Sequence, residues 1–246
     1  MFDAARITSG MRVLDVAAGT GDTSILAAQR VLPGGSVLAL DISSSMLEVA
    51  AETATAAGLS NLETLAQDAT HLEFPSASFD AAISRLGLMF LSDLQRGLRA
   101  ICAALEPNAR LAAIVWSATE RNPYMGSSVD IVRELRGLPT PPPAVVRAFS
   151  LAAPSVLEKA LADAGFHDVT VEAVPTVRTF SSVDEALELL FTASSAMPDL
   201  LSGASQREQD QVTDRLRQTF EQFRQADGTC VMPGEVLLGS GAAGSA

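Results

Sequence analysis

The sequence predicts an α/β protein with a doubly wound, mostly parallel β-sheet of seven strands. Short apolar runs alternate with amphipathic helical patterns through the first two thirds of the 246 residues. Two of these runs, 11–17 and 36–41, are apolar along most of their length, which is typical of parallel strands buried on both faces. With 48% hydrophobic residues the chain can bury a large core, so we expect a single domain over 1–246.

The other strands and helices follow in order along the chain. We expect strands at 61–68, 79–84, 110–117, 168–174 and 234–242. Asp22 or Thr23 can cap the first helix, and Ser43 can begin the second. The third helix carries apolar residues at steps of three and four until Pro107 and Asn108 end it. This alternation places a ligand at the carboxyl ends of the strands.

The pattern changes after Ser117. A helix there ends at the segment PTPPP, which has too few backbone donors for a helix or a central strand. A helix over 154–166, with Gly165 at its C-terminal end, precedes the sixth strand. We expect 118–150 and 181–232 to be helical insertions that cover the ligand pocket. The final GSGAAGSA is expected to be a frayed tail.

Composition and charge exclude several classes of protein. The net charge is −12 and the only lysine is Lys159, so we expect no nucleic-acid partner. Cys102, Cys230 and two histidines are too few for a zinc site or a disulfide framework, and no metal is expected. No stretch predicts a membrane span or a signal peptide. We expect a cytoplasmic protein, monomeric or homodimeric, whose residue usage suggests a GC-rich bacterial genome.

The motif VLDVAAGTGDTS, residues 13–24, leads a buried strand through a glycine-bearing turn into a helix. Such a turn lets the backbone approach a ligand closely and directs N–H groups toward it. A dinucleotide site requires G-x-G-x-x-G, but after Gly19 and Gly21 the third position is Ser24. Asp22 would also place negative charge where a diphosphate lies. The motif therefore predicts a nucleotide-type site that is poorly suited to a nicotinamide cofactor.

Acidic residues at the ends of three successive strands suit a cationic adenosine ligand that has no phosphate. S-adenosylmethionine (SAM) carries a sulfonium and an amino acid group. Asp15 can receive its ammonium, directly or through water, and Asp41 can accept both ribose hydroxyls. Asp68 can take the adenine amino group while Ala69 offers a backbone N–H to the ring. One acid alone would be an ordinary surface charge or a helix cap, whereas three together predict a SAM site.

Four motifs carry a resemblance to a known family: VLDVAAGTG, LALDIS with SSML, QDATHLEFPSASFDAAISRLGLMF and RLAAIVWS. In them the sequence resembles a class I SAM-dependent methyltransferase of the UbiE-like small-molecule group, closely over 11–117 and more loosely to 242. The resemblance implies a Rossmann-like sheet with an antiparallel last strand, a small-molecule methyl acceptor, and S-adenosylhomocysteine as product. The cofactor-binding residues that we expect are Asp15, Ala17, Gly19, Thr20, Gly21, Asp41, Ile42, Met46, Asp68, Ala69 and Ser84.

The sequence departs from the family pattern in three places. Ala17 stands where the first motif usually has glycine, and its Cβ can tighten the pocket. The usual Pro-Gly-Gly turn is Pro107-Asn108-Ala109 here. Only ten residues precede the first strand, where the family usually carries a helical segment over the cofactor. We therefore expect either that the insertions supply this cover or that the chain is a truncated form with impaired activity.

Five side chains are candidates for catalysis or substrate contact. His71 can serve as a general base, although we favour a dispensable loop histidine. Arg85, at the end of the fourth strand, either holds an anionic substrate or forms a salt bridge. Met89, Trp116 and Tyr124 are expected to contact the substrate, and for Trp116 packing is the alternative. No catalyst is identified, since methyl transfer needs chiefly placement of the acceptor and exclusion of water.

The sequence therefore predicts SAM-dependent methylation, on O, N or C, of a small hydrophobic or aromatic metabolite. Two alternatives stay open. A non-catalytic SAM-binding protein, or a pericyclase-like protein on the same fold, would keep all of these motifs. An NAD(P)-dependent oxidoreductase ranks lower, because the only tyrosine, Tyr124, is followed four residues later by Ser128 in place of a lysine.

Overall fold

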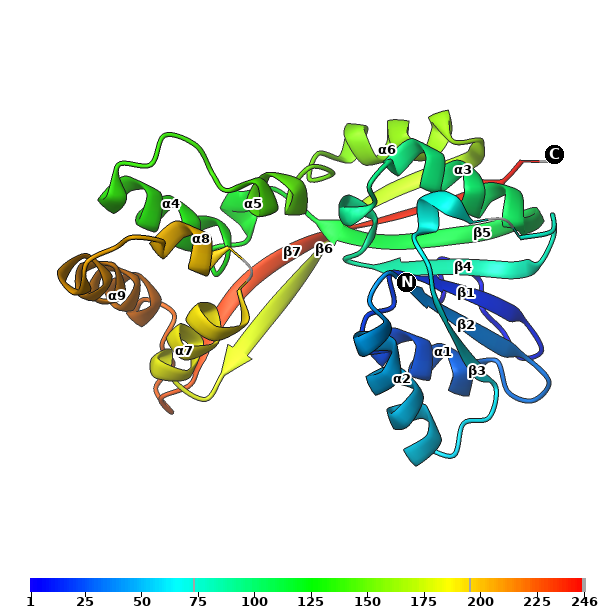
Figure 1. The fold of residues 1–246 in the computed structure, drawn as a ribbon, viewed down its shortest axis with the longest axis horizontal. Helices are drawn as coiled ribbons and strands as arrows, with labels where there is room; N and C mark the ends of the chain where they lie inside the picture. The colour runs from blue at the N-terminus through cyan, green and yellow to red at the C-terminus, as the bar shows by residue number, and fades with distance from the viewer. Residues whose placement is uncertain (73, 195, 245–246) are drawn as a thin grey trace. The chain divides into compact units, whose positions relative to one another are not determined.

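The structure, a computed structural model, describes residues 1–72, 74–194 and 196–244. Within these residues one sheet has the strand order β3-β2-β1-β4-β5-β7-β6 (Figure 1). The strands are β1 (Arg12–Val16), β2 (Ser36–Asp41), β3 (Leu62–Ala66), β4 (Phe79–Arg85), β5 (Leu105–Trp116), β6 (Phe166–Phe180) and β7 (Cys230–Ala243). The sheet is mostly parallel with antiparallel last strands, which confirms the predicted fold class.

The chain divides into two compact units. Unit 1 comprises Met1–Val115, Ala153–Glu172 and Leu237–Ala246. Unit 2 comprises Trp116–Ala152 and Ala173–Val236. The long strands β6 and β7 therefore each contribute residues to both units. The sequence predicts a single domain with two helical insertions, and this domain organisation stays a prediction.

Unit 1 contains the parallel part of the sheet. β1 pairs with β2 on one side and with β4 on the other, so that Asp15 lies between Ala39 and Ile83 in register. β2 pairs in parallel with β3, and β4 with β5. The strand order changes direction between β1 and β4, and in open parallel sheets ligands bind beyond the carboxyl ends of the strands at such a switch point.

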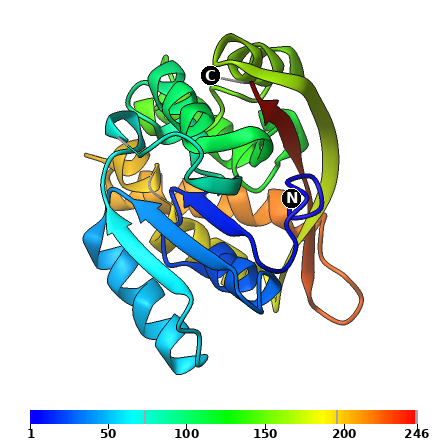
Figure 2. The ribbon, with the colours of Figure 1, turned by 90° about the vertical axis from the view of Figure 1, so that its right-hand side faces the viewer.

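Helices cover both faces of this sheet. They are α1 (Asp22–Arg30), α2 (Ser44–Ala56), α3 (Leu94–Ala104) and α6 (Pro154–Asp163). α1 and α2 lie on one face and α3 on the other, as Figures 1 and 2 both show. Val13, Leu14 and Ile83 are fully buried between the layers. Among the first ten residues Ala5 and Ile7 are also buried, because they belong to the same apolar cluster as Val13.

The helix starts differ in one case from the prediction. Ser43 caps α2 as predicted, since its hydroxyl accepts a hydrogen bond from the Met46 backbone N–H. α1 is capped by neither Asp22 nor Thr23. Its N-cap is Gly21, which has φ 83° and makes no side-chain cap. The chain needs a left-handed residue to turn from β1 into α1, and glycine adopts that conformation at low cost.

Unit 2 has its own apolar core, which includes Val132, Leu190, Leu216 and Phe220. Its helices are α4 (Gly126–Arg136), α5 (Pro143–Ala148), α7 (Val183–Ala193), α8 (Met197–Leu201) and α9 (Gln206–Glu221). The sequence analysis missed α5. This helix begins at the last proline of PTPPP, where a first helical position needs no backbone donor.

The prediction of a frayed C-terminal tail is wrong for residues 239–243. These residues form the end of β7, and Ala242 and Ala243 are buried in unit 1. Gly239 and Gly241 fit there because a Cβ would approach the side chains of Leu157 and Phe166 within 3 Å. Small residues at this end therefore reflect close packing. Residues 245–246 of the predicted tail lie outside the described residues.

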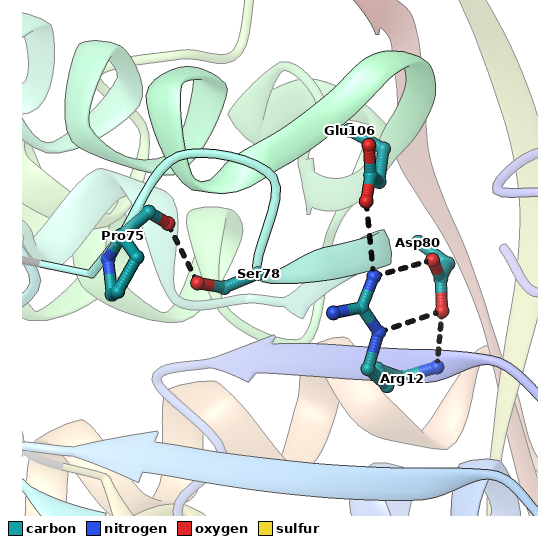
Figure 3. Close-up of polar contacts among 5 residues, drawn as sticks. All are labelled: Arg12, Pro75, Ser78, Asp80 and Glu106. Carbon is teal, nitrogen blue, oxygen red and sulfur yellow. Dashed lines mark hydrogen bonds and ion pairs between the residues drawn. The ribbon is translucent and has the colours of Figure 1, made fainter.

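The amino ends of β1 and β4 are joined by the cluster in Figure 3. Asp80 accepts hydrogen bonds from the Arg12 backbone N–H, Nε and guanidinium Nη2, at 2.7, 3.2 and 2.8 Å. Arg12 also reaches Glu106 at 3.2 Å. Pairing between β4 and β5 is irregular here, because Phe79 pairs with Leu105 whereas Ala81 pairs with Arg110. β5 begins at Leu105, earlier than predicted. Nearby, the Ser78 hydroxyl donates to the Pro75 carbonyl.

We expect Asp80→Asn to lower the free energy of unfolding by about 1 kcal/mol at pH 7, because partly exposed ion pairs contribute little more. The hydrogen bonds from Arg12 hold the Asp80 pKa below its usual range. For a carboxyl with a lowered folded-state pKa, the stabilisation is present above the unfolded pKa and is lost as pH falls through the folded pKa. Urea unfolding should therefore show the difference at pH 7 and a smaller one at pH 3.

The matched control is Asp163→Asn, which removes the exposed Lys159 ion pair within α6. It should change the free energy of unfolding by roughly 0.3–0.5 kcal/mol, as other exposed helical pairs do. An Asp80 effect that is equal at both pH values would contradict the ionic account.

Candidate functional site

A tight turn at the carboxyl end of β1 forms the base of the candidate site. Ala17, Gly19 and Gly21 have φ values of 56, 57 and 83°. The Ala18 backbone N–H donates to the Leu40 carbonyl at 2.9 Å, so the turn is tied to β2. Three left-handed residues within five positions reverse the chain in little space, which brings the start of α1 close to the end of β1.

The two predicted glycines also allow close packing against α2. A Cβ at Gly21 would lie 2.6 Å from the Ala50 Cβ, and one at Gly19 would lie 3.1 Å from the Met46 Cε. Thr20, between them, is exposed. Gly21 is therefore required by packing as well as by backbone conformation, and Gly19 lies beside Met46, one of the predicted cofactor-binding residues.

Asp41 anchors this turn to the end of β2. One carboxylate oxygen accepts a hydrogen bond from the Gly19 N–H at 2.8 Å, and the other accepts one from the Ser43 N–H at 2.9 Å. Each carboxylate oxygen has a second lone pair. The side chain can therefore keep both contacts while it accepts two ligand hydroxyls.

Asp15 is a buried carboxyl that is only half satisfied. It is 1% exposed, and its Oδ2 accepts a hydrogen bond from the Ser24 hydroxyl at 2.6 Å. Its Oδ1 is buried without a hydrogen-bond partner among the described residues. Burial raises the Asp15 pKa to about 7, while Ser24 and the charge of Arg85 act in the opposite direction. A buried polar atom without a partner is unusual and suits a ligand donor.

A second such atom lies on the neighbouring strand. The Ser84 hydroxyl is fully buried, and the described part of the chain offers it no hydrogen-bond partner. Ile83 is the register partner of Asp15, so Ser84 lies one position further toward the carboxyl end of β4. Asp15 and Ser84 therefore lie on neighbouring strands at the carboxyl edge of the sheet, at the switch point.

Apolar side chains are exposed just after β2. Ile42 is 75% exposed and Met46 is 42% exposed, whereas Leu47 is buried in the core. Exposed isoleucine and methionine beside a glycine turn offer a flat apolar surface to a ring. The sequence offers either an adenine contact or core packing for Met46 and Leu47; Leu47 lies in the core, and the adenine contact of Met46 stays a prediction.

Asp68 and Ala69 begin the short helix η1 (Ala69–His71). Asp68 accepts hydrogen bonds from the Thr70 N–H at 2.8 Å and from the Ser92 hydroxyl at 3.0 Å. The Thr70 bond is the largest reason why the Asp68 pKa is lowered. Asp68 thus stays charged, and Ala69 is buried beside it. The His71 Nδ1 lies 3.9 Å from Asp68, on a side chain that is 62% exposed.

Arg85 connects the end of β4 to the start of α1. Its Nε donates to the Thr23 hydroxyl at 2.9 Å, and its guanidinium pairs with Asp22 at 3.2 Å. The salt bridge, which is one of the two predicted roles, is therefore formed in the structure. Both side chains remain substantially exposed, so the pair itself contributes little to stability.

The remaining predicted contacts lie in different places. Met89, in the short helix η2 (Leu88–Phe90), is buried in unit 1. Trp116 and Tyr124 belong to unit 2. Tyr124 is 8% exposed, and its hydroxyl donates to the Ala186 carbonyl at 3.1 Å. Whether these three side chains contact an acceptor stays a prediction.

Sequence reasoning missed Gly87 and the role of Ser24. A Cβ at Gly87 would lie only 2.4 Å from the Ala17 Cβ. The Ala17 methyl group therefore occupies the space that a side chain at 87 would need. Ser24, noted only because it replaces a third glycine, holds the buried Asp15. Both depend on contacts between distant segments, so no local pattern indicates them.

Neither a membrane-crossing helix nor a metal-binding cluster was found in the described part of the chain. No helix there combines the length and the apolar character that a span requires. Groups of three or more histidine, cysteine, aspartate and glutamate side chains that could hold a metal ion are likewise absent from these residues.

We expect Gly87→Ala to lower the free energy of unfolding by about 1–3 kcal/mol, because the added methyl group overpacks the contact with Ala17. Ala17→Gly in that background should recover part of the loss, as it removes the clashing Cβ and a left-handed alanine. Urea unfolding of the two single variants and the double variant gives the coupling energy. Additive effects would contradict this contact.

Comparison with known proteins gives one family. A model of the methyltransferase domain matches residues 7–135. A demethylmenaquinone methyltransferase from Listeria monocytogenes serotype 4a (strain HCC23) is 40% identical over 109 residues, which are 44% of this chain and 46% of that protein. The ubiquinone/menaquinone biosynthesis C-methyltransferase UbiE from Francisella tularensis subsp. novicida (strain U112) is 38% identical over 112 residues, 45% of each chain. The matched region thus spans about half the length of these relatives.

Solved structures share the fold over the whole chain. The YcgJ protein from Bacillus subtilis has a TM-score of 0.60 at 18% identity and covers 100% of this chain and 97% of its own. The [4+2]-cyclase SpnF has a TM-score of 0.57 at 19% identity, with 99% of this chain and 79% of its own covered. The family model covers about half of the chain and includes the β1 turn, β2 and β4. The chain therefore belongs to the methyltransferase domain family.

Proposed function

We propose that this chain transfers the methyl group of SAM to a small hydrophobic or aromatic acceptor and releases S-adenosylhomocysteine. The observation that carries the proposal is the half-satisfied carboxyl of Asp15 beside the glycine turn that Asp41 anchors. A cationic amino group of the ligand would donate the hydrogen bond that the Asp15 carboxyl lacks. Two vicinal hydroxyls of the ligand would suit the Asp41 carboxylate. Membership of the methyltransferase domain family supports the same ligand.

The residues at the carboxyl edge fit the proposed cofactor part by part. Asp15 would bind the ammonium in the amino acid portion of SAM, and the turn at Gly19 would lie against that portion. Asp41 would accept the ribose hydroxyls. Ile42 and Met46 would cover the adenine ring, since both are exposed there. Asp68, Ala69 and Ser84 complete the proposed set, together with Ala17, Thr20 and Gly21.

The proposed reaction is a direct displacement. The cofactor supplies an electrophilic methyl group on a sulfonium. A lone pair or carbanion of the acceptor attacks the methyl carbon while the carbon–sulfur bond breaks and its electron pair returns to sulfur. The protein's part is to hold the two reactants in line and exclude water. His71 is largely exposed, and we assign it no role as a base.

The acceptor is proposed only as a class. The two relatives are named for quinone methylation, but each match covers less than half of this chain, and the family model ends at residue 135, before most of unit 2. We therefore keep O, N and C acceptors open. The helical segments within 118–150 and 181–232 are proposed to cover the substrate pocket. Location in the cytoplasm, lack of a nucleic-acid partner and the oligomeric state stay predictions.

A second candidate function is SAM binding without methyl transfer. The likeness of the fold to the [4+2]-cyclase SpnF favours keeping it. Both functions require the same cofactor site, so binding experiments do not separate them. Formation of S-adenosylhomocysteine in the presence of an acceptor does.

We expect Asp41→Ala to weaken SAM binding at least tenfold, because the turn loses its anchor and the ribose loses its acceptor. Isothermal titration calorimetry with SAM and with S-adenosylhomocysteine measures the change. Asp163→Ala, a substitution on the exposed side of α6, is the control and should bind as the unaltered protein does. Equal affinity for SAM in Asp41→Ala would remove this residue from the proposed site.

We expect SAM affinity to rise between pH 6 and pH 8, because an ammonium binds the charged form of Asp15, whose pKa in the empty site is about 7. Below that pKa, binding must release the carboxyl proton, and above it the cost disappears. Titrations in buffers of different ionisation enthalpy should detect the released proton at pH 6. Asp15→Asn should abolish this proton release. Proton release that persists in Asp15→Asn would show that a group other than Asp15 titrates.

A further inference from the structure

Unit 2 contains a cavity of about 290 Å³ that is partly open to solvent. Its walls come from α4, α5, α7 and α8 and from the end of β6, and they include Val129, Val145, Phe180, Leu190 and Met197. These five side chains are buried and belong to the apolar core of the unit. The volume is at the lower end of the range for small-molecule pockets. It suits a compact molecule of one or two rings and excludes a long lipid chain.

Arg178, on β6, is the one charged side chain among the described residues that line this cavity. The residue is exposed, so the guanidinium lies at the solvent side of the cavity. Its central carbon is 4.8 Å from the centre of the Tyr124 ring and 6.0 Å from that of Trp116. Cation–π contacts at these distances hold the guanidinium in place without neutralising its charge.

No carboxylate pairs with Arg178 in the described ranges of the chain. Arg217 of the same unit, by contrast, pairs with Asp184. Arg136 donates two hydrogen bonds to the backbone carbonyls of Leu200 and Ser202. Unlike these two arginines, Arg178 has neither a carboxylate partner nor a hydrogen bond to a backbone carbonyl among the described residues.

The Tyr124 ring lies beside Arg178 at the cavity, and the Tyr124 hydroxyl is held by the backbone. The hydroxyl donates to the Ala186 carbonyl, and the ring packs 4.9 Å from Phe180. Burial raises the Tyr124 pKa, so this hydroxyl stays neutral. The ring therefore forms an aromatic wall beneath Arg178, and the cavity has an apolar body with one cationic end.

We propose that this cavity binds an aromatic carboxylate, with the rings among the apolar side chains and the carboxylate on the Arg178 guanidinium. A planar guanidinium matches a carboxylate in a two-point hydrogen bond, which is stronger than a neutral one. Burial of the rings adds roughly 25 cal/mol for each Å² of apolar surface removed from water. The proposal rests on unit 2 alone and does not depend on methyl transfer.

The probe that tests it is 2-naphthoate, with the neutral naphthalene-2-carboxamide as its match in shape. Calorimetric titration of the full chain should give at least tenfold tighter binding of the carboxylate. Arg178→Gln should reduce naphthoate affinity to the level of the amide and leave amide affinity unchanged. Arg178→Lys should retain part of the preference, because it keeps the charge but loses the planar fork.

Two controls connect the binding to this cavity. Arg147→Gln, on the exposed side of α5, should leave both affinities unchanged. Ala148→Leu, on the same helix, adds volume where Ala148 lines the cavity and should weaken both ligands. The single tryptophan, Trp116, gives one indole N–H resonance, which should shift when naphthoate binds. Melting temperatures confirm that each variant is folded.

The proposal is overturned if the folded protein binds naphthoate and the amide equally, or if Arg178→Gln binds naphthoate unchanged. Failure to bind naphthoate at millimolar concentration also overturns it. SAM titrations of Arg178→Gln run in parallel and report on the cofactor site in unit 1. A loss of naphthoate binding with SAM binding intact therefore supports this cavity independently of the proposed methyl transfer.

Discussion

The two hydrogen bonds that Asp41 accepts from Gly19 and Ser43 hold the candidate site together. They fix the left-handed turn after β1 against the start of α2. Gly21 then packs against Ala50 of α2. This contact fixes α1 and α2 relative to β1 and β2. The turn from Ala17 to Gly21 depends on the Asp41 hydrogen bonds, and so does the start of α2 beside it.

A second consequence concerns charge. The turn buries Asp15, and the fold leaves one of its oxygens without a partner among the described residues. Ser24 stabilises the other oxygen, while Arg85 is held nearby by Thr23 and Asp22. Burial of a half-satisfied carboxyl costs free energy of folding. A cationic ligand would recover that cost, which links the stability of the fold to the proposed cofactor.

The fold and the cofactor edge were predictable because their signals are local. Strand ends with Asp15, Asp41 and Asp68 can be recognised from short motifs, and the sheet order follows from strand–helix alternation. The Gly21 cap, the Gly87 contact and the identity of the Arg85 partner were not, since each depends on packing between segments distant in sequence. The cavity at Arg178 is formed by five elements of unit 2, so no sequence pattern indicates it.

Methyl transfer itself is tested most directly with SAM that carries a deuterated methyl group. The protein would be incubated with this SAM and a panel of hydroxy-, amino- and quinol-type aromatic acceptors, followed by mass spectrometry of both products. The account predicts S-adenosylhomocysteine and an acceptor that gains one CD₃ group in equal amounts. Tight binding of SAM with neither product across the panel would contradict it and leave a SAM-binding protein without methyl transfer.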